Sequence, residues 1–132
     1  MKKTKTMFTY ASIIAAGLLI GYVVPRVPML FKADYAEGNY ASHFPDAKTH
    51  VVMYSTANCS FCKKTRAYFA ENKVDYIDLD VEKSAVAASR HAALGGEGVP
   101  VIIIGNRLIR GYQPEVFSQA LLAMHKLQTA AQ

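Results

Sequence analysis

The chain is poor in the side chains that hold metals, with only two cysteines and four histidines among 132 residues. A tetrahedral structural zinc site needs four ligands, and there is no second Cys-x-x-Cys pair and no closely spaced pair of histidines. The histidines are scattered, and we expect all four to be ordinary surface or loop residues: His43, His50, His91 and His125. These shortages disfavour a metal centre, although metal binding by the two cysteines stays open.

The chain also lacks any concentrated charge and any low-complexity segment. Its formal charge of +5 divides as +2 over residues 1–47 and +3 over residues 48–132, without interleaved aromatic and basic residues. That distribution is too diffuse for a nucleic-acid-binding surface, so we expect no nucleic-acid partner. With 52% hydrophobic residues, the composition is that of a globular domain, and the length allows one domain plus an appendage.

The appendage is an uncharged run at the N-terminus, residues 7–24. As a helix this run rises about 27 Å, close to the about 30 Å of a bilayer's hydrocarbon core. Three lysines precede it, Pro25 follows it, and no small-x-small cleavage site comes directly after it. We predict an uncleaved signal anchor over residues 1–24, with a cleaved secretory signal as the alternative. The positive-inside bias then exports the rest of the chain, in a bacterium to the periplasmic face of the inner membrane.

Residues 25–47 contain three prolines and no sustained period, which predicts a linker ahead of a folded domain over residues 48–132. In that domain, Cys59 and Cys62 form a single Cys-x-x-Cys between a predicted strand, residues 50–56, and a predicted helix, residues 63–72. Three basic residues that follow are expected to add positive potential near the site: Lys63, Lys64 and Arg66.

A thiol at the first turn of a helix faces unpaired backbone N–H groups and the positive end of the helix dipole, and both favour the thiolate. Cys59 is therefore the candidate nucleophile, and Cys62, one turn deeper, is the candidate resolving thiol. An inert disulfide stays open as an alternative, although a bridge across four residues would constrain the unfolded chain little.

The rest of the domain predicts the order β-α-β-α-β-β-α. A strand, a helix and a strand in succession form a right-handed unit with parallel strands. The remaining elements are a strand over 74–81, a helix over 82–94, an apolar central strand over 99–104, its hairpin partner over 107–111 and a helix from Pro114. The first helix is expected to bury one face, and the last another: Thr65, Tyr68, Phe69 and Asn72, then Phe117, Ala120, Leu121 and Met124.

Together these motifs resemble the glutaredoxin family of the thioredoxin fold over about residues 49–127. The resemblance rests on Val52-Met53-Tyr54-Ser55-Thr56 before Cys59-Ser60-Phe61-Cys62, on Val74-Asp75-Tyr76 with Asp78-Leu79-Asp80, on Gly98-Val99-Pro100-Val101, and on Gly111-Tyr112. It implies a thioredoxin-like α/β fold with a four-stranded mixed sheet. It also implies a monomeric thiol–disulfide oxidoreductase without a bound cofactor, which exchanges with protein or low-molecular-weight disulfides and with a thiol electron donor.

The resemblance further implies a substrate groove beside the cysteines. Val99–Pro100 would be a cis peptide bond, and the backbone of Val99 would pair with an extended peptide or with glutathione, a candidate co-substrate. Phe61 stands where glutaredoxins usually carry tyrosine and would form one wall, with Gly111 and Tyr112 also lining the groove.

The chain departs from the family pattern in three places. Ser60 replaces the usual proline, no lysine lies just upstream of Cys59, and residues 110–114 replace the usual Gly-Gly-x-Asp. The last stretch looks more like the glutaredoxin-like proteins that are reduced by thioredoxin reductase. Two other functions stay open: an iron–sulfur or metal-binding module that uses Cys59 of two chains, and a redox-silent adaptor that binds one protein partner.

Overall fold

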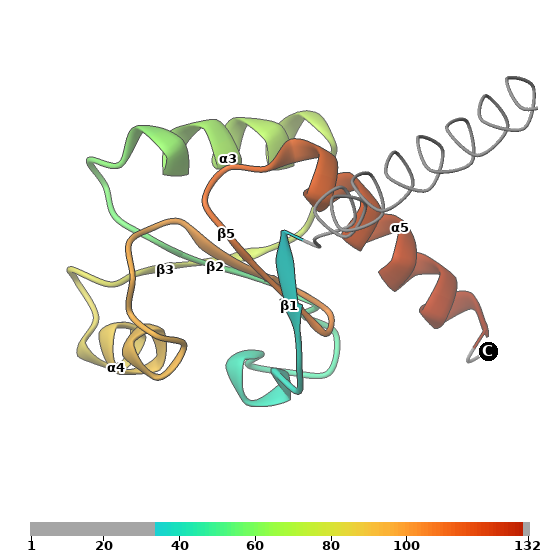
Figure 1. Ribbon diagram of the computed structural model, residues 1–132, viewed down its shortest axis with the longest axis horizontal. Coiled ribbons are helices and arrows are strands. Elements are labelled where there is room, and N and C mark those ends of the chain that lie inside the picture. The colour runs from blue at the N-terminus through green and yellow to red at the C-terminus, as the bar shows by residue number, and fades with distance from the viewer. Residues whose placement is uncertain (1–33, 131–132) are drawn as a thin grey trace, which may run out of the picture. The chain divides into compact units, whose positions relative to one another are not determined.

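The computed structural model describes residues 34–130, in which helices cover both faces of a mixed sheet (Figure 1). The elements follow the chain as β1 (Tyr35–Glu37), the 3₁₀-helix η2 (Ala41–His43), β2 (Val51–Ser55), α3 (Ser60–Glu71), β3 (Ile77–Asp80), α4 (Ala85–Ala93), β4 (Val101–Ile104), β5 (Arg107–Arg110) and α5 (Pro114–Ala130). From β2 onward this is the predicted order of strands and helices.

The sheet has five strands in the order β1-β5-β4-β2-β3. The β2 and β3 strands are parallel, with Val52 opposite Ile77, as expected when a helix connects them. The β4 strand is antiparallel to both β2 and β5, so the predicted central position of the apolar run is confirmed. This arrangement places the carboxyl end of β2, which leads into the cysteines, beside the start of β4.

The expected four-stranded sheet is wrong by one strand, because β1 adds to the edge of β5. The two strands are antiparallel, and Tyr35 lies opposite Ile109. Arg107 secures the pairing: its guanidinium carbon lies 4.4 Å from the centre of the Tyr35 ring, and its Nε lies 3.3 Å from Glu37 Oε1. The predicted linker over residues 25–47 is therefore wrong for the part from Asp34 onward, which belongs to the same compact unit as the cysteines. Three residues are too few to show a strand period.

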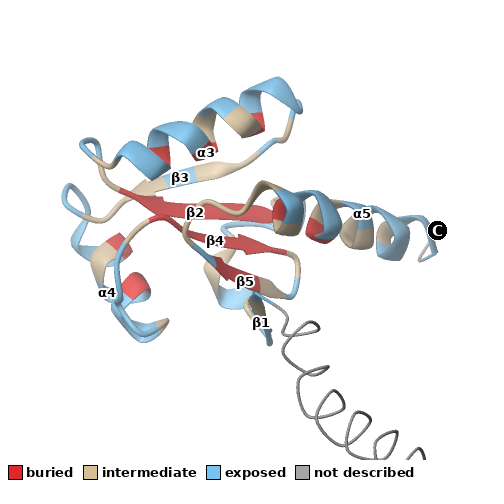
Figure 2. Ribbon diagram, turned by 45° about the horizontal axis from the view of Figure 1, so that its top comes forward, coloured by how far each residue is buried: buried red, intermediate tan, exposed pale blue. Residues whose placement is uncertain are grey.

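Two apolar cores fill the faces of the sheet. Figure 2 shows that β2, β4 and β5 are the most continuously buried elements. One core joins alternate strand residues to α3 and α5: Val51, Met53, Phe69, Ile102, Ile104, Ile109, Phe117 and Ala120. The other joins the intervening strand residues to α4: Val52, Tyr54, Ala87, Val101, Ile103 and Leu108. Because successive strand side chains point to opposite faces, a strand that is buried on both sides reads as a continuous apolar run.

The segment around η2 helps to cover the α4 side of the sheet. Tyr40 and Phe44 pack against the second core, next to the area that α4 covers. Asp46 Oδ1 then accepts hydrogen bonds from the backbone N–H groups of Lys48 and Thr49, which turns the chain toward β2. The segment ahead of β2 is thus a packed part of the domain.

The cysteine helix begins earlier than its sequence pattern indicates, at Ser60. Thr65 and Phe69 are fully buried, as predicted for this face. Tyr68 is only half-buried, and Asn72 is exposed at the end of the helix, where its side-chain amide donates to the Tyr68 carbonyl. The predicted stripe is therefore correct for its first turns and wrong at its last residue.

The predicted signal anchor over residues 1–24 lies outside the described residues. Across residues 34–130, no helix is long and apolar enough to cross a membrane. The membrane anchor stays a prediction from the sequence.

Candidate active site

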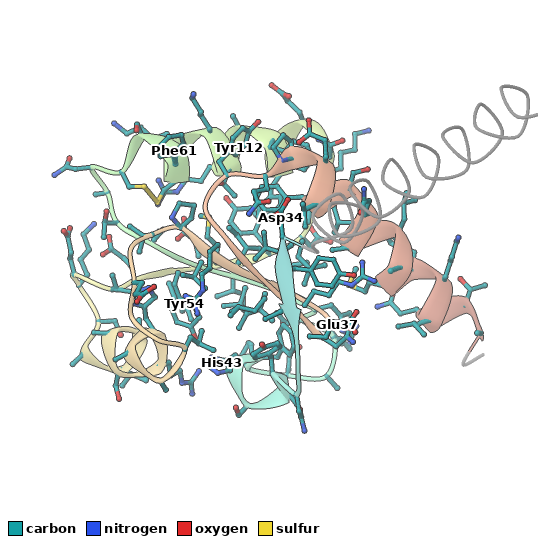
Figure 3. The ribbon with its side chains drawn as sticks, in the orientation of Figure 1. Asp34, Glu37, His43, Tyr54, Phe61 and Tyr112 are labelled. Carbon is teal, nitrogen blue, oxygen red and sulfur yellow. A yellow bond between two sulfur atoms is a disulfide. The ribbon has the colours of Figure 1, made fainter. Side chains whose placement is uncertain are left out.

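Cys59 and Cys62 lie together where β2 ends and α3 begins, and they form a disulfide with their Cα atoms 5.2 Å apart (Figure 3). Cys62 is fully buried, while Cys59 is partly exposed. An attacking thiol has to meet a substrate, whereas a resolving thiol has only to reach its neighbour. The difference in exposure fits Cys59 for the first role and Cys62 for the second.

Cys59 is the N-cap residue of α3, and its sulfur accepts a hydrogen bond from the backbone N–H of Cys62 at 3.1 Å. Lys63 N–H bonds to the Cys59 carbonyl, so the helix begins directly at the cysteine. A sulfur in this position lies at the positive end of the helix dipole and accepts a hydrogen bond from a backbone N–H. Both interactions stabilise the sulfur when it is an anion. The local backbone therefore favours a thiolate whenever the bond between the two cysteines is open.

The backbone before β4 lies beside the same sulfur. Val99–Pro100 is a cis peptide bond, and the Val99 carbonyl oxygen is 3.6 Å from Cys59 Sγ. The N–H of Gly111, a residue with φ of +78°, donates to the Pro100 carbonyl at 2.8 Å. The structure thus brings Val99 to Cys59 from a segment that is far away in the sequence, and Gly111 is bound to the adjacent Pro100.

The two aromatic residues of the expected groove, Phe61 and Tyr112, differ in their exposure to solvent. Phe61 is 53% exposed on the first turn of α3, with Lys64 Nζ 5.4 Å from the centre of its ring. Tyr112 is half-buried, and its ring packs edge-to-face on Phe117 of the first core. Phe61 is therefore available to a substrate, whereas Tyr112 is tied to the core.

A polar cluster that the sequence patterns did not reveal fastens the base of the site. Arg66 Nε lies 2.6 Å from Asp78 Oδ2, and Arg66 Nη2 donates to Ser55 Oγ at 2.8 Å and to the Thr56 carbonyl at 3.4 Å. The Ser55 hydroxyl in turn donates to Asp78. This cluster joins the end of β2 to α3 and β3, and it pairs the Arg66 charge, which we had expected to add positive potential. The one sequence feature that could have indicated this cluster is Ser55, a polar residue at the end of an otherwise apolar strand.

The expectation that all four histidines are ordinary surface or loop residues is wrong for His91, and His43 is partly withdrawn from solvent. His91 of α4 is 8% exposed, and its Nε2 lies 2.8 Å from the Gly98 carbonyl oxygen. His43 of η2 is half-buried, and its Nδ1 lies 2.7 Å from the hydroxyl of the fully buried Tyr54. Figure 3 labels both residues. Both histidines satisfy hydrogen bonds that link separate segments of the domain.

Burial lowers the pKa of His43, and the positive charge of Arg90 lowers it further. Because the unfolded chain binds a proton that the folded state resists, we expect the free energy of unfolding to fall as the pH drops from about 6.5 through the lowered pKa. Urea unfolding of the full chain at about pH 7.5 and about pH 5 measures the change.

A His43→Phe variant should lose much of this pH dependence, whereas His125→Phe, which alters an exposed residue of α5, should keep it. Equal pH dependence in the wild type and in His43→Phe would contradict the assignment to His43.

Within residues 34–130, no group of three or more His, Cys, Asp or Glu side chains is placed to hold a metal ion. The arrangement that the described residues do offer is a cysteine pair with unequal exposure beside a backbone edge.

Comparison with known proteins supports the family resemblance seen in the sequence. The family model for glutaredoxin matches residues 51–109, from β2 through most of β5. An uncharacterized glutaredoxin-like 8.6 kDa protein in the rubredoxin operon of Clostridium pasteurianum is 33% identical over 63 residues, which is 47% of this chain and 84% of the relative.

Solved structures agree in fold. The thioredoxin-like protein BC3987 superposes with a TM-score of 0.51 and 26% identity, over 54% of this chain and 99% of the other. The glutaredoxin-like protein NrdH-redoxin from Escherichia coli gives 0.50 and 23%, over 52% and 91%. The part of this chain that superposes on these structures therefore has a thioredoxin-like fold. With the cysteine pair at the start of α3 and the relative matched over most of its length, the chain belongs to the glutaredoxin family.

Proposed function

We propose that the protein is a thiol–disulfide oxidoreductase that works through Cys59 and Cys62. One observation carries this proposal: the partly exposed Cys59 sulfur accepts the N–H of Cys62 at the start of α3, with the buried Cys62 sulfur within bonding reach. This combination supplies an activated attacking sulfur and a second sulfur that can resolve the mixed disulfide. An inert structural bridge needs neither.

The exchange takes place in two balanced steps. The Cys59 thiolate attacks one sulfur of a substrate disulfide, a bond forms between them, and the other substrate sulfur leaves as a thiolate. The Cys62 thiol then loses its proton to solvent, and the thiolate so formed attacks Cys59 Sγ and releases the first substrate sulfur as a thiolate. The substrate gains two electrons, and the protein keeps the Cys59–Cys62 disulfide until a thiol donor reduces it by the reverse steps.

The substrate would lie along the Val99 backbone. Its carbonyl is 3.6 Å from Cys59 Sγ, so a disulfide presented there by an extended chain would have its sulfur next to the nucleophile. Phe61, which lies between the two cysteines in the sequence and is 53% exposed, offers an apolar contact. Protein disulfides and glutathione mixed disulfides share this chemistry, and both are proposed as substrates.

We further propose that residues 7–24 tether the domain to the cytoplasmic membrane and that the cysteines act on the exported side. The support is the uncharged run itself and the three lysines ahead of it. In that location, an electron donor would have to operate across or outside the membrane.

The test is the redox equilibrium of the full chain in detergent against glutathione buffers, with the thiol state of both cysteines read by alkylation and mass spectrometry. We expect a reversible two-electron transition. A value near about −270 mV would identify a reductant, and one near about −120 mV an oxidant. Cysteines that stay locked in one state across this range would refute the proposed exchange.

A further inference from the structure

Three aromatic side chains from separate segments form a column on the α4 side of the sheet. The Tyr54 ring of β2 lies between His43 of η2 and His91 of α4, with ring centres 5.9 Å apart on each side. Tyr54 is fully buried, and its hydroxyl bonds to His43 Nδ1 at 2.7 Å. Figure 3 shows His43 and Tyr54 pointing toward each other beside α4.

The column ends on the loop that faces the cysteines. His91 Nε2 lies 2.8 Å from the Gly98 carbonyl oxygen, and because a carbonyl only accepts, Nε2 carries the proton and donates. Gly98 has φ of +67°, a left-handed backbone that turns the chain into Val99. The Val99 carbonyl oxygen is the atom 3.6 Å from Cys59 Sγ.

The same loop is held at its other end as well. Arg110 Nη2 donates to the Leu94 carbonyl at 2.6 Å, at the end of α4. A five-residue turn from Leu94 to Gly98 contains three glycines and would otherwise be free to adopt several backbone conformations. The two bonds therefore fix both ends of the turn, and the His91 bond is the one next to the substrate edge.

We propose that His91 is a positioning residue for disulfide substrates of extended peptide type, and that His43, through Tyr54, holds the His91 ring in place. His91 donates to Gly98 and so sets the place of the Val99 backbone, with which an extended substrate pairs. The segment ahead of β2 is in this way connected to the substrate edge through side chains. This inference rests on the proposed function, and it assigns no chemical step to either histidine.

The test uses steady-state kinetics with two substrates on the full chain in detergent. One is a mixed disulfide between glutathione and an eight-residue peptide, and the other is 2-hydroxyethyl disulfide, which is too short to pair with a backbone edge. His91→Leu should raise KM for the peptide disulfide about fivefold, which corresponds to one lost hydrogen bond, with kcat almost unchanged. Rates with 2-hydroxyethyl disulfide should stay at the wild-type value.

Two variants separate positioning from general weakening of α4. His91→Gln keeps a donor and should recover most of the peptide KM, while Ser89→Gly, at an exposed position of α4, destabilises the helix without touching the loop and should leave the KM unchanged. His43→Phe should raise the KM in the same direction as His91→Leu, but less. If His91→Leu slows both substrates alike, or has no more effect than Ser89→Gly, the positioning role is refuted.

A spectroscopic readout is independent of activity. In the reduced protein, the carbonyl ¹³C shift of Gly98 and the amide shifts of Val99 should move in His91→Leu and return in His91→Gln. A wild type that reduces neither substrate would refute the proposed function, while these shifts would still decide whether His91 holds the loop. Unmoved shifts in His91→Leu would refute the positioning role even in an active enzyme.

Discussion

Replacing Cys59 with serine is expected to lower disulfide-exchange activity by at least about a thousandfold, because a serine hydroxyl stays protonated where a helix-capping thiol ionises. The substitution is nearly isosteric, and serine is a favoured N-cap residue, so α3 should keep its start. The loss would therefore reflect the sulfur itself. The measurement is the rate of reduction of a protein disulfide by the full chain, followed with a thiol reagent.

Cys62→Ser is the matched control, because it removes the buried sulfur and leaves the attacking one. This variant should still open a substrate disulfide but should stop at the mixed disulfide, which intact-mass analysis would detect as a covalent adduct on Cys59. If Cys59→Ser retains activity, or if the adduct forms at residue 62 of a Cys59→Ser chain instead, the roles assigned to the two thiols are wrong.

Phe69→Ala is expected to cost about 3–5 kcal/mol of unfolding free energy, the range for large aromatic truncations in a core. Phe69 is fully buried on the inner face of α3, and its ring packs on Tyr76 and Phe117, with ring centres 4.8 Å and 5.6 Å away. Since domains of this size are stable by about 5–15 kcal/mol, the variant should lose about a fifth of its stability or more. Urea unfolding gives the difference from the change in midpoint.

Phe61→Ala is the control for Phe69→Ala on the same helix. Because Phe61 is 53% exposed, its truncation should change stability by less than about 0.5 kcal/mol. Its expected effect is on substrate binding instead. A large stability loss in Phe61→Ala, or a small one in Phe69→Ala, would contradict the burial pattern of α3.

The sequence was sufficient for the parts of the fold that depend on local pattern. The β2 and β4 strands are buried on both faces, so each is a continuous run of apolar residues that could be recognised without knowing its neighbours. The Cys-x-x-Cys between a strand and a helix located the candidate site, and the structure places Cys59 at the N-cap of α3, which begins at Ser60 and not at residue 63. The family resemblance supplied the cis bond before Pro100, which no local pattern reveals.

The contacts that could not be predicted join segments by their side chains. The Arg66–Asp78 pair and the bond from His43 to Tyr54 depend on which residues of distant elements face each other. Histidine and arginine side chains are usually exposed, so the residue types alone predicted surface positions. Only the packing of α3, α4 and η2 shows that these side chains bind across segments. The β1 strand was missed for a related reason, because its evidence lies in Arg107 and in the rest of β5.

The short β1 strand has a consequence for solubility. It occupies the open hydrogen-bonding edge of β5, a strand whose Leu108 and Ile109 are buried. A fragment that begins at residue 48 would leave that edge unpaired, and an exposed apolar edge is a template on which a second chain can add its own strand. Residues 35–37 therefore protect the edge of β5 from pairing with a second chain, and a fragment meant to keep this protection should begin no later than Asp34.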